Sequence, residues 1–430
     1  MQRHYRGILI FFLLVLISIF TPTHKTKANQ PDPGRFDWRD QGYDFPVHDQ
    51  LGCDAGYAFA GVDAVQAAIW KKERIKVNLS ENNAIRCTWY ALNNYGGLPH
   101  TCNGGDFRML INLFTQKGLV LESCDPLNLQ DLDCNQACDA AYYVTEWQYI
   151  NKFTQYIPVD VIKALLVEYG PLYAQMDSNI AGFEYFKGNG IIEVEDNLET
   201  ENNHGVLIVG WDDNLGDHGV WIAKNSYGTD WGDDGYFYVA QNSAGVGKYV
   251  GFVTGWEKST PTRKLYYFDH AGHTNQIEPD GFPDRNGSAL AIFNIEEEEV
   301  IRSIEFWTTD KSTVITRVYT QFENNNPENL VYESQSINIP NAGYYTMNLP
   351  PLEVSPGDDL VIELNVTNFY NLFPIATDSI GPELCHHTWF KNEYGLWDSF
   401  TTGEIDAAIR LRTWVKTEGF TRIFLPIISR

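Results

Sequence analysis

Positive charge is scarce in this sequence. Its 430 residues include 31 Lys and Arg but 56 Asp and Glu, which gives a formal net charge of −25 at pH 7. Proteins bind nucleic acids and anionic lipid surfaces through basic patches, so neither is expected as a partner. Disorder is excluded too, because hydrophobic residues make up 43% of the chain and suffice for packed cores. This balance suits a soluble extracellular protein.

Long apolar runs are missing everywhere except near the N-terminus. A basic segment at 3–6 precedes the apolar run Ile8–Phe20, and residues 26–28 (Thr-Lys-Ala) offer a small-residue cleavage site. A run of this length is short for a transmembrane helix and typical of a secretory signal. We therefore predict a signal peptide at 1–28 and a protein that is secreted, extracellular or at the cell surface. The alternative is an uncleaved signal anchor, which would be the chain's one contact with a membrane.

Cysteine is nearly absent from the second half of the chain. Six of the seven cysteines fall in the first 138 residues: Cys53, Cys87, Cys102, Cys124, Cys134 and Cys138. In an oxidising compartment this even set predicts three disulfides, although six cysteines allow fifteen pairings and the count does not choose among them. Cys385 is left over as a buried or free thiol.

The first half of the chain has two helical segments, at 55–74 and 103–118. From residue 205 the pattern changes to short strands such as GVLIVGW and DGYFYVA. Helices followed by strands predict an α+β domain with segregated layers, which we place at 36–256.

A second domain is indicated by a change of composition. The polar, proline-containing segment EKSTPTRK predicts a linker at 257–265. Beyond it, short alternating segments are separated by turn signals such as Asp-Gly and Asn-Gly, which predicts an all-β sandwich or jelly roll at 266–415. The apolar tail at 416–430 is either an edge strand or a surface-retention signal.

Six motifs of the first domain occur together in one order. They are FDWRD from 36, PVHDQLGCDAGYAFAG from 46, LSENNAIRC from 79, CNGG from 102, NNHGVLIVGW from 202 and IAKNSYGTDWGDDGYFYV from 222. Over the whole of 36–256 the chain resembles the papain-family cysteine peptidases, which implies a papain-like domain of two lobes. In that family a Cys at a helix N-terminus, beside a His, is held as a thiolate that attacks a peptide carbonyl.

The resemblance assigns catalytic positions and exposes a gap among them. Gln50 matches the Gln of the oxyanion hole, His204 the catalytic His, and Asn225 the Asn that orients it. The family reads Q-x-x-C-G-S-C-W-A-F where this chain reads QLGCDAGYAF, so Gly56 falls on the nucleophile. Glycine has no side chain that can attack a carbonyl. We therefore predict a catalytically inactive homologue, a pseudoenzyme.

The resemblance also assigns residues to substrate binding. Gly104 and Gly105 match glycines that let a substrate backbone approach in the cleft. Trp231 matches a Trp of the motif that carries the Asn, whereas Tyr227 replaces another Trp that shields the His–Asn bond. A cleft that keeps these residues is expected to bind an extended peptide or protein segment by strand addition, even without a nucleophile.

Two other residues near Gly56 leave alternatives open. Cys53 is the remaining candidate for a nucleophile, and it supports a second hypothesis of an active secreted cysteine endopeptidase. The resemblance implies instead that Cys53 is bridged to Cys102. Asp54 either caps the helix that follows it or pairs with His204.

The second domain resembles the lectin-like β-sandwich found behind some bacterial papain-family peptidases. The resemblance rests on YYFDHAGHTNQ from 266 and on GLWDSF and AAIRLRTWV near the end of the domain. It implies attachment to a glycan or a cell surface, with Ca²⁺ as an open option. Trp389 and Trp397 either stack on sugars or belong to the core. A third hypothesis makes this domain the working part and the first domain a spacer.

An acidic loop follows the strand that ends near Trp211. It contains Asp212, Asp213, Asn214 and Asp217, and such oxygen-rich loops bind Ca²⁺ in some proteins. The spacing is not that of an EF-hand, so we expect a solvated turn, with no metal site and no cofactor.

Overall fold

The computed structural model describes most of the chain between residues 34 and 416. The described residues are 34–93, 102, 104–128, 134–152, 155–194, 202–277, 285–357, 359–382, 387–399 and 405–416. The predicted signal peptide, Cys385 and all but the first residue of the predicted tail lie outside them. No helix within these ranges is long and apolar enough to cross a membrane.

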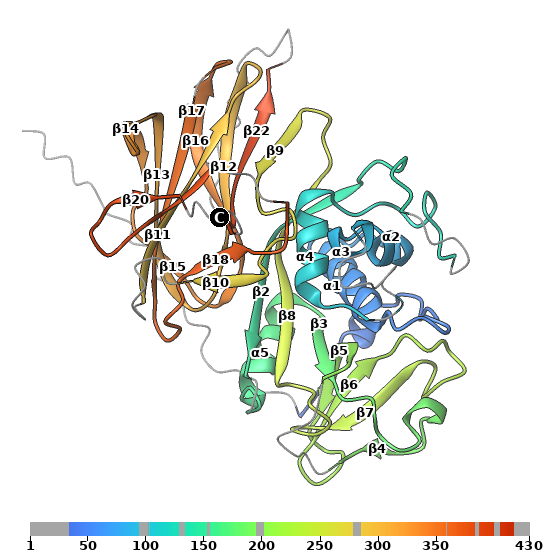
Figure 1. The fold of residues 1–430 in the computed structure, drawn as a ribbon. Coiled ribbons are helices and arrows are strands. Elements are labelled where there is room, and N and C mark those ends of the chain that lie inside the picture. The colour runs from blue at the N-terminus through green and yellow to red at the C-terminus, as the bar shows by residue number, and fades with distance from the viewer. Residues whose placement is uncertain are drawn as a thin grey trace, which may run out of the picture. The chain divides into compact units, whose positions relative to one another are not determined.

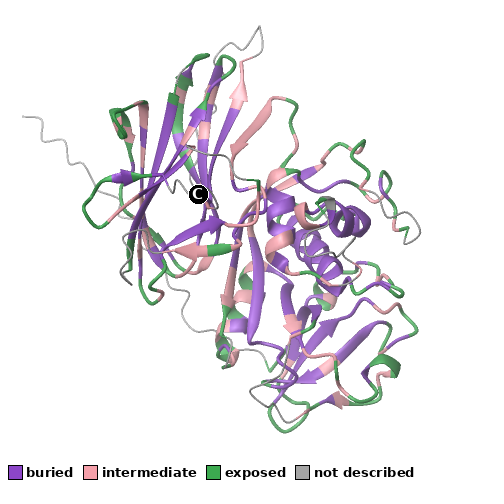
Figure 2. Cartoon of the chain, in the orientation of Figure 1, coloured by how far each residue is buried: buried purple, intermediate pink, exposed green. Residues whose placement is uncertain are grey.

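The two predicted helices are both present. The first is α1 (Gly56–Glu73), whose residues from Gly56 to Trp70 are all buried, so it is the central helix of its domain (Figure 2). The second is α4 (Phe107–Gln116), which starts later than expected because the Asp106 carboxylate accepts hydrogen bonds from the N–H groups of Arg108 and Met109 and caps the helix there. The remaining α-helices described are α2 (Glu81–Arg86), α3 (Trp89–Leu92) and α5 (Val159–Tyr169).

The strands of the first domain belong to one sheet that packs against α1. They are β1 (Arg35–Asp37), β2 (Tyr142–Asn151), β3 (Leu172–Met176), β4 (Ile191–Ile192), β5 (His204–Asp212), β6 (Val220–Lys224), β7 (Tyr236–Ala240) and β8 (Tyr249–Lys258). Their order is β2-β8-β3-β5-β6-β7-β4, with β1 paired to β5. Helix α1 contacts β3, β5 and β8, and Figure 1 shows α1 to α4 gathered on one side of these strands. This helical layer against a sheet gives the α+β domain that the sequence predicted.

The second domain is a sandwich of two antiparallel sheets. Its strands are β9 (Arg263–Tyr267), β10 (Asn275–Ile277), β11 (Asn286–Asn294), β12 (Glu299–Thr308), β13 (Ser312–Glu323), β14 (Asn326–Glu333), β15 (Ile337–Ile339), β16 (Ala342–Val354), β17 (Asp359–Asn368), β18 (Ile375–Asp378), β19 (Thr388–Lys391), β20 (Trp397–Asp398), β21 (Asp406–Ala407) and β22 (Ile409–Val415). One sheet contains β10-β18-β12-β16 with β22 and β9, and the other runs β14-β13-β17-β11-β19-β20. Side chains that point inward from both sheets form the core between them, for example Ile304 on β12, Val318 on β13 and Ile362 on β17.

The two domains share a sheet. Strand β8 continues to Lys258 and β9 begins at Arg263, so only residues 259–262 of the predicted linker at 257–265 lie outside a strand. Strand β16 of the sandwich pairs with β2 of the first domain, with Gly343 opposite Gln148. A Cβ at Gly343 would collide with the carbonyl oxygen of Trp147, so this close pairing needs glycine. The connection is therefore a continuous sheet with a short turn beside it.

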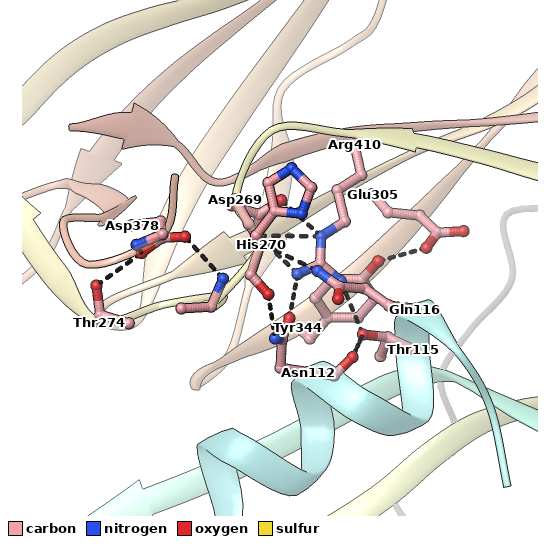
Figure 3. A network of polar contacts seen from close by, with 12 residues as sticks. Asn112, Thr115, Gln116, Asp269, His270, Thr274, Glu305, Tyr344, Asp378 and Arg410 are labelled. Atoms are coloured by element: carbon pink, nitrogen blue, oxygen red, sulfur yellow. Dashed lines mark hydrogen bonds and ion pairs between the residues drawn. The ribbon is translucent and has the colours of Figure 1, made fainter. Parts of the chain in front are cut away.

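A buried arginine ties α4 to the sandwich (Figure 3). Arg410 lies on β22 and is fully buried, and its Nε and Nη2 donate to the carboxylate of Asp269 at 2.9 and 2.6 Å. The same guanidinium donates to Oγ1 of Thr115 at 2.8 Å and to Oδ1 of Asn112 at 2.6 Å, both on α4. Gln116 completes the contact by donating to the backbone carbonyl of Asp269. One side chain thus links both domains.

We expect Arg410→Met to destabilise the whole chain. The substitution leaves Asp269 buried without its counter-ion, which costs about 3–5 kcal/mol of unfolding free energy. Guanidinium chloride unfolding measures the loss. The matched control is Lys76→Met, because Lys76 is exposed and pairs with exposed Asp44 at 3.1 Å, a contact worth less than about 1 kcal/mol. Equal small losses in both variants would contradict the role given to Arg410.

A buried histidine near the domain junction makes stability depend on pH. Burial, together with the positive charge of Arg108, lowers the pKa of His273 to about 3. Between that pH and about 6.5 the unfolded chain binds a proton at this histidine that the folded chain excludes. The contribution of His273 to the unfolding free energy is therefore fully present above about pH 6.5 and is lost progressively as the pH falls. We expect the parent to lose roughly 2 kcal/mol more than His273→Phe between pH 7 and pH 5. Parallel curves of unfolding free energy against pH would contradict this.

Candidate active site

The segment before α1 is fixed by covalent and backbone bonds. Cys53 forms a disulfide with Cys102, and the N–H of Asp54 donates to the carbonyl of Cys102 at 3.1 Å. Ala55 is the residue that precedes α1, and no side chain caps the helix there, so the interpretation of Asp54 as a cap was wrong. Because Cys53 is bridged, it has no thiol to serve as a nucleophile. The other disulfides join Cys87 to Cys134 and Cys124 to Cys138.

His204 and Asn225 are brought together by neighbouring strands. His204 begins β5 and Asn225 follows β6, and the two strands are paired. Nε2 of His204 lies 2.8 Å from Oδ1 of Asn225, an oxygen that also accepts the N–H of Ser226. Since that amide oxygen only accepts, Nε2 carries the proton and Nδ1 keeps a free lone pair. This is the arrangement that the sequence motifs predicted for the pair.

The imidazole of His204 is neutral at pH 7. Burial lowers its pKa, and the hydrogen bond to Asn225 and the negative charge of Asp54 only partly oppose this effect. A charged imidazolium would stabilise a neighbouring thiolate. The six cysteines that the structure describes are all in disulfides, so among these residues there is no thiolate for an imidazolium to stabilise.

Gly56 lies directly against this imidazole. It is the first residue of α1, and a Cβ added to it would collide with Cε1 and Nδ1 of His204. The ring therefore occupies the space that a side chain at position 56 would need. The next residue of β5, Gly205, packs on Tyr57 so closely that a Cβ there would collide with the Tyr57 Cα. Glycine at both positions lets β5 approach the first turn of α1.

Both polar atoms of the Gln50 side-chain amide make hydrogen bonds within the protein. Its Nε2 donates to the carbonyl of Cys53 at 2.7 Å, and its Oε1 accepts from Oγ of Ser226 at 2.6 Å. The side chain is 4% exposed. Gln50 is thus present at the predicted position, but one of its two amide hydrogens is turned to the protein backbone.

The predicted substrate-binding residues divide into two groups. Gly104 and Gly105 line the cleft, and the Tyr57 ring lies where a side chain at Gly105 would stand. Trp231 is buried beneath the cleft, where its Nε1 donates to the Phe183 carbonyl at 2.7 Å. Tyr227 covers His204 instead, with ring centroids 5.2 Å apart.

A cavity of about 280 Å³ opens beside His204. Its lining is Gln50, Asp54, Gly56, Tyr57, Gly104, Gly105, Tyr173, Gln175, Ser178, Asn202, Asn203, His204, Gly205 and Tyr227. The sequence motifs did not predict that β3 forms one wall of this cavity, because nothing in the sequence around Gln175 indicates a site. The antiparallel pairing of β3 with β5 sets Gln175 opposite Gly205 and brings that wall to the cavity.

The acidic loop and the two tryptophans have structural contacts. Oδ2 of Asp213 accepts from Lys163 Nζ at 2.6 Å, and its Oδ1 accepts from Gln241. Trp389 and Trp397 are only 9% and 7% exposed and pack in a small core, so the core interpretation holds and sugar stacking by these two residues was wrong. The exposed aromatic side chains of the sandwich lie elsewhere.

Comparison with known proteins assigns the first domain to a family. The sequence pattern of the papain family cysteine proteases matches residues 32–253, so the chain belongs to that family. The sequence pattern of the lectin-like domain family matches residues 265–387. The protein is therefore a papain-family chain with a lectin-like β-domain behind it, as the sequence motifs predicted.

Individual relatives support the same division. The chain is 28% identical to cathepsin S of Bos taurus over 242 residues, 54% of this chain and 67% of the relative, and 30% identical to cathepsin R of Mus musculus over 262 residues, 56% and 73%. It resembles in fold the clostridial cysteine protease Cwp84 after propeptide cleavage, with a TM-score of 0.76, 18% identity and coverage of 89% of this chain and 99% of that one. A second structure holds the cysteine protease and lectin-like domains of Cwp84, a surface layer associated protein of Clostridium difficile. Its TM-score is 0.73, with 18% identity and coverage of 89% and 88%.

Proposed function

We propose that this protein is a secreted or cell-surface peptide-binding member of the papain family that does not cleave what it binds. The observation that carries the proposal is Gly56 at the start of α1, against His204, where the family places its nucleophile. The three disulfides suit an oxidising compartment.

No hydroxyl among the described residues of the cavity is arranged to replace the thiolate. The one serine of the lining, Ser178, donates its Oγ hydrogen to Oδ1 of Asn203 at 2.8 Å. The hydroxyls of Tyr57, Tyr173 and Tyr227 are weak nucleophiles, and burial raises the pKa of Tyr173 and Tyr227 further. His204 is therefore a base without an attacking group to activate.

The remaining geometry serves binding. Gly104 leaves open space where a side chain would stand, and the cavity provides hydrogen-bonding groups on its β3 side. An extended peptide needs both, because its backbone must approach closely and its amides must find partners. The neutral Nδ1 of His204 adds one acceptor.

The first test is a peptidase assay on a panel of fluorogenic peptides. We expect the parent chain to stay at background and Gly56→Cys to raise cleavage by roughly 10²-fold, the low end of general-base catalysis, because the imidazole has to move back to admit Sγ. The control is the double variant Gly56→Cys with His204→Ala, which should return to background. Cleavage that depends on the parent chain and is blocked by a thiol-directed inhibitor would overturn the proposal and favour an active endopeptidase.

A second function, attachment through the lectin-like domain, is favoured by an exposed aromatic loop. Phe369, Tyr370, Leu372 and Phe373 connect β17 to β18, and Tyr370 is 72% exposed. The loop is held in place by Asp310, whose Oδ2 accepts the N–H groups of Tyr370 at 2.6 Å and Asn371 at 2.8 Å. Aromatic faces presented on an ordered loop suit stacking on sugar rings. We propose a glycan as the ligand of this loop.

We expect Tyr370→Ala to weaken glycan binding by the full chain about tenfold, the effect of losing one stacked ring. A glycan array, followed by titration of the best glycan, measures it. Tyr394→Ala is the matched control, because Tyr394 is 78% exposed on a different turn. Equal binding by parent and Tyr370→Ala would place any glycan site away from this loop.

A further inference from the structure

The cavity beside His204 has an unusual chemical lining. Its side chains are amides, tyrosines, a serine, a histidine and one carboxylate, interspersed with glycines. Neither an aliphatic side chain nor a lysine or arginine is among these described lining residues. An apolar ligand group would find only the tyrosine faces, because aliphatic contacts are missing from the walls.

Asp54 supplies the single full charge of this lining. Its backbone is fixed by the Cys53–Cys102 disulfide and by the hydrogen bond of its N–H to Cys102. Its side chain is exposed, and within the described part of the chain it has neither a hydrogen-bond nor an ion-pair partner. The carboxylate is therefore available to a ligand.

Asp54 lines the cavity together with Gly56, the position at which the family has its nucleophile. Asp54, His204 and Tyr227 line the same cavity. Burial lowers the pKa of His204 and raises that of Tyr227, and the negative charge of Asp54 acts on both rings in the raising direction. Tyr57 and Tyr227 both line the cavity. Aromatic rings next to a carboxylate favour a cation, which is attracted by the charge and by the ring faces.

We propose that this cavity binds the cationic side chain of a peptide, arginine or lysine, with Asp54 as its counter-ion and Tyr57 and Tyr227 beside it. The inference rests on the proposed peptide-binding function and names the class of residue that the cleft selects. An acidic side chain is repelled by Asp54. The net charge of −25 steers basic peptides toward the protein in the same sense.

The test compares arginine with citrulline, which has nearly the same shape but no charge. The probes are two dye-labelled, acetylated and amidated pentapeptides of alanine with arginine or citrulline at the centre, titrated into the full chain by fluorescence anisotropy. We expect the parent to bind the arginine peptide about tenfold more tightly, as one charge-assisted contact gives. Asp54→Asn should abolish this preference, because the affinity for the arginine peptide falls to that for the citrulline peptide. Asp398→Asn removes an exposed carboxylate of the sandwich and should keep the preference.

The possible results distinguish the selection of a cationic side chain from the proposed peptide binding itself. If both peptides bind the parent equally, the cleft binds peptide but does not select a cation, and the inference falls while the proposed function stands. If the preference persists in Asp54→Asn, another group provides it and Asp54 is not the counter-ion. If neither peptide binds, the inference falls together with peptide binding in this cleft. Circular dichroism of Asp54→Asn checks that the variant is folded.

Discussion

The close packing of β5 on the first turn of α1 sets the geometry of the whole cleft. Gly205 allows the approach, because any side chain there would meet the backbone of Tyr57. That approach sets His204 against Gly56, while the pairing of β5 with β3 and β6 adds the wall around Gln175 and the hydrogen bond to Asn225. The site is thus assembled around one helix end.

The sandwich is built into the same body as the cleft. Pairing of β16 with β2 continues the sheet from one domain to the other, and the Arg410–Asp269 pair joins β22 to α4 (Figure 3). A surface-binding loop on the sandwich would therefore hold the cleft in a fixed relation to whatever the loop binds. The two proposed functions, attachment and peptide capture, would then belong to one compact unit that spans residues 35–430.

The departures from the family pattern form a consistent chemical change. Gly56 stands at the position that the resemblance assigns to the nucleophile, the imidazole of His204 occupies the space that a side chain there would need, and burial lowers the pKa of that ring. Asp54 adds a negative charge to a cavity whose remaining walls are polar. A thiolate beside a carboxylate would be destabilised, so Asp54 is consistent with the proposed loss of covalent chemistry. The cationic ligand proposed above would suit a cleft with this lining.

The sequence determined the order of helices and strands, the all-β second domain, and the positions of Gln50, Gly56, His204 and Asn225, because each depends on a local pattern or a recognisable motif. It also implied the bond between Cys53 and Cys102. Only the tertiary structure decided that Trp389 and Trp397 are core, that the predicted linker is mostly strand, and that β3 lines the cavity. These features arise from strand pairing and packing between segments far apart in the chain, and a local pattern does not record which distant segment will cover it.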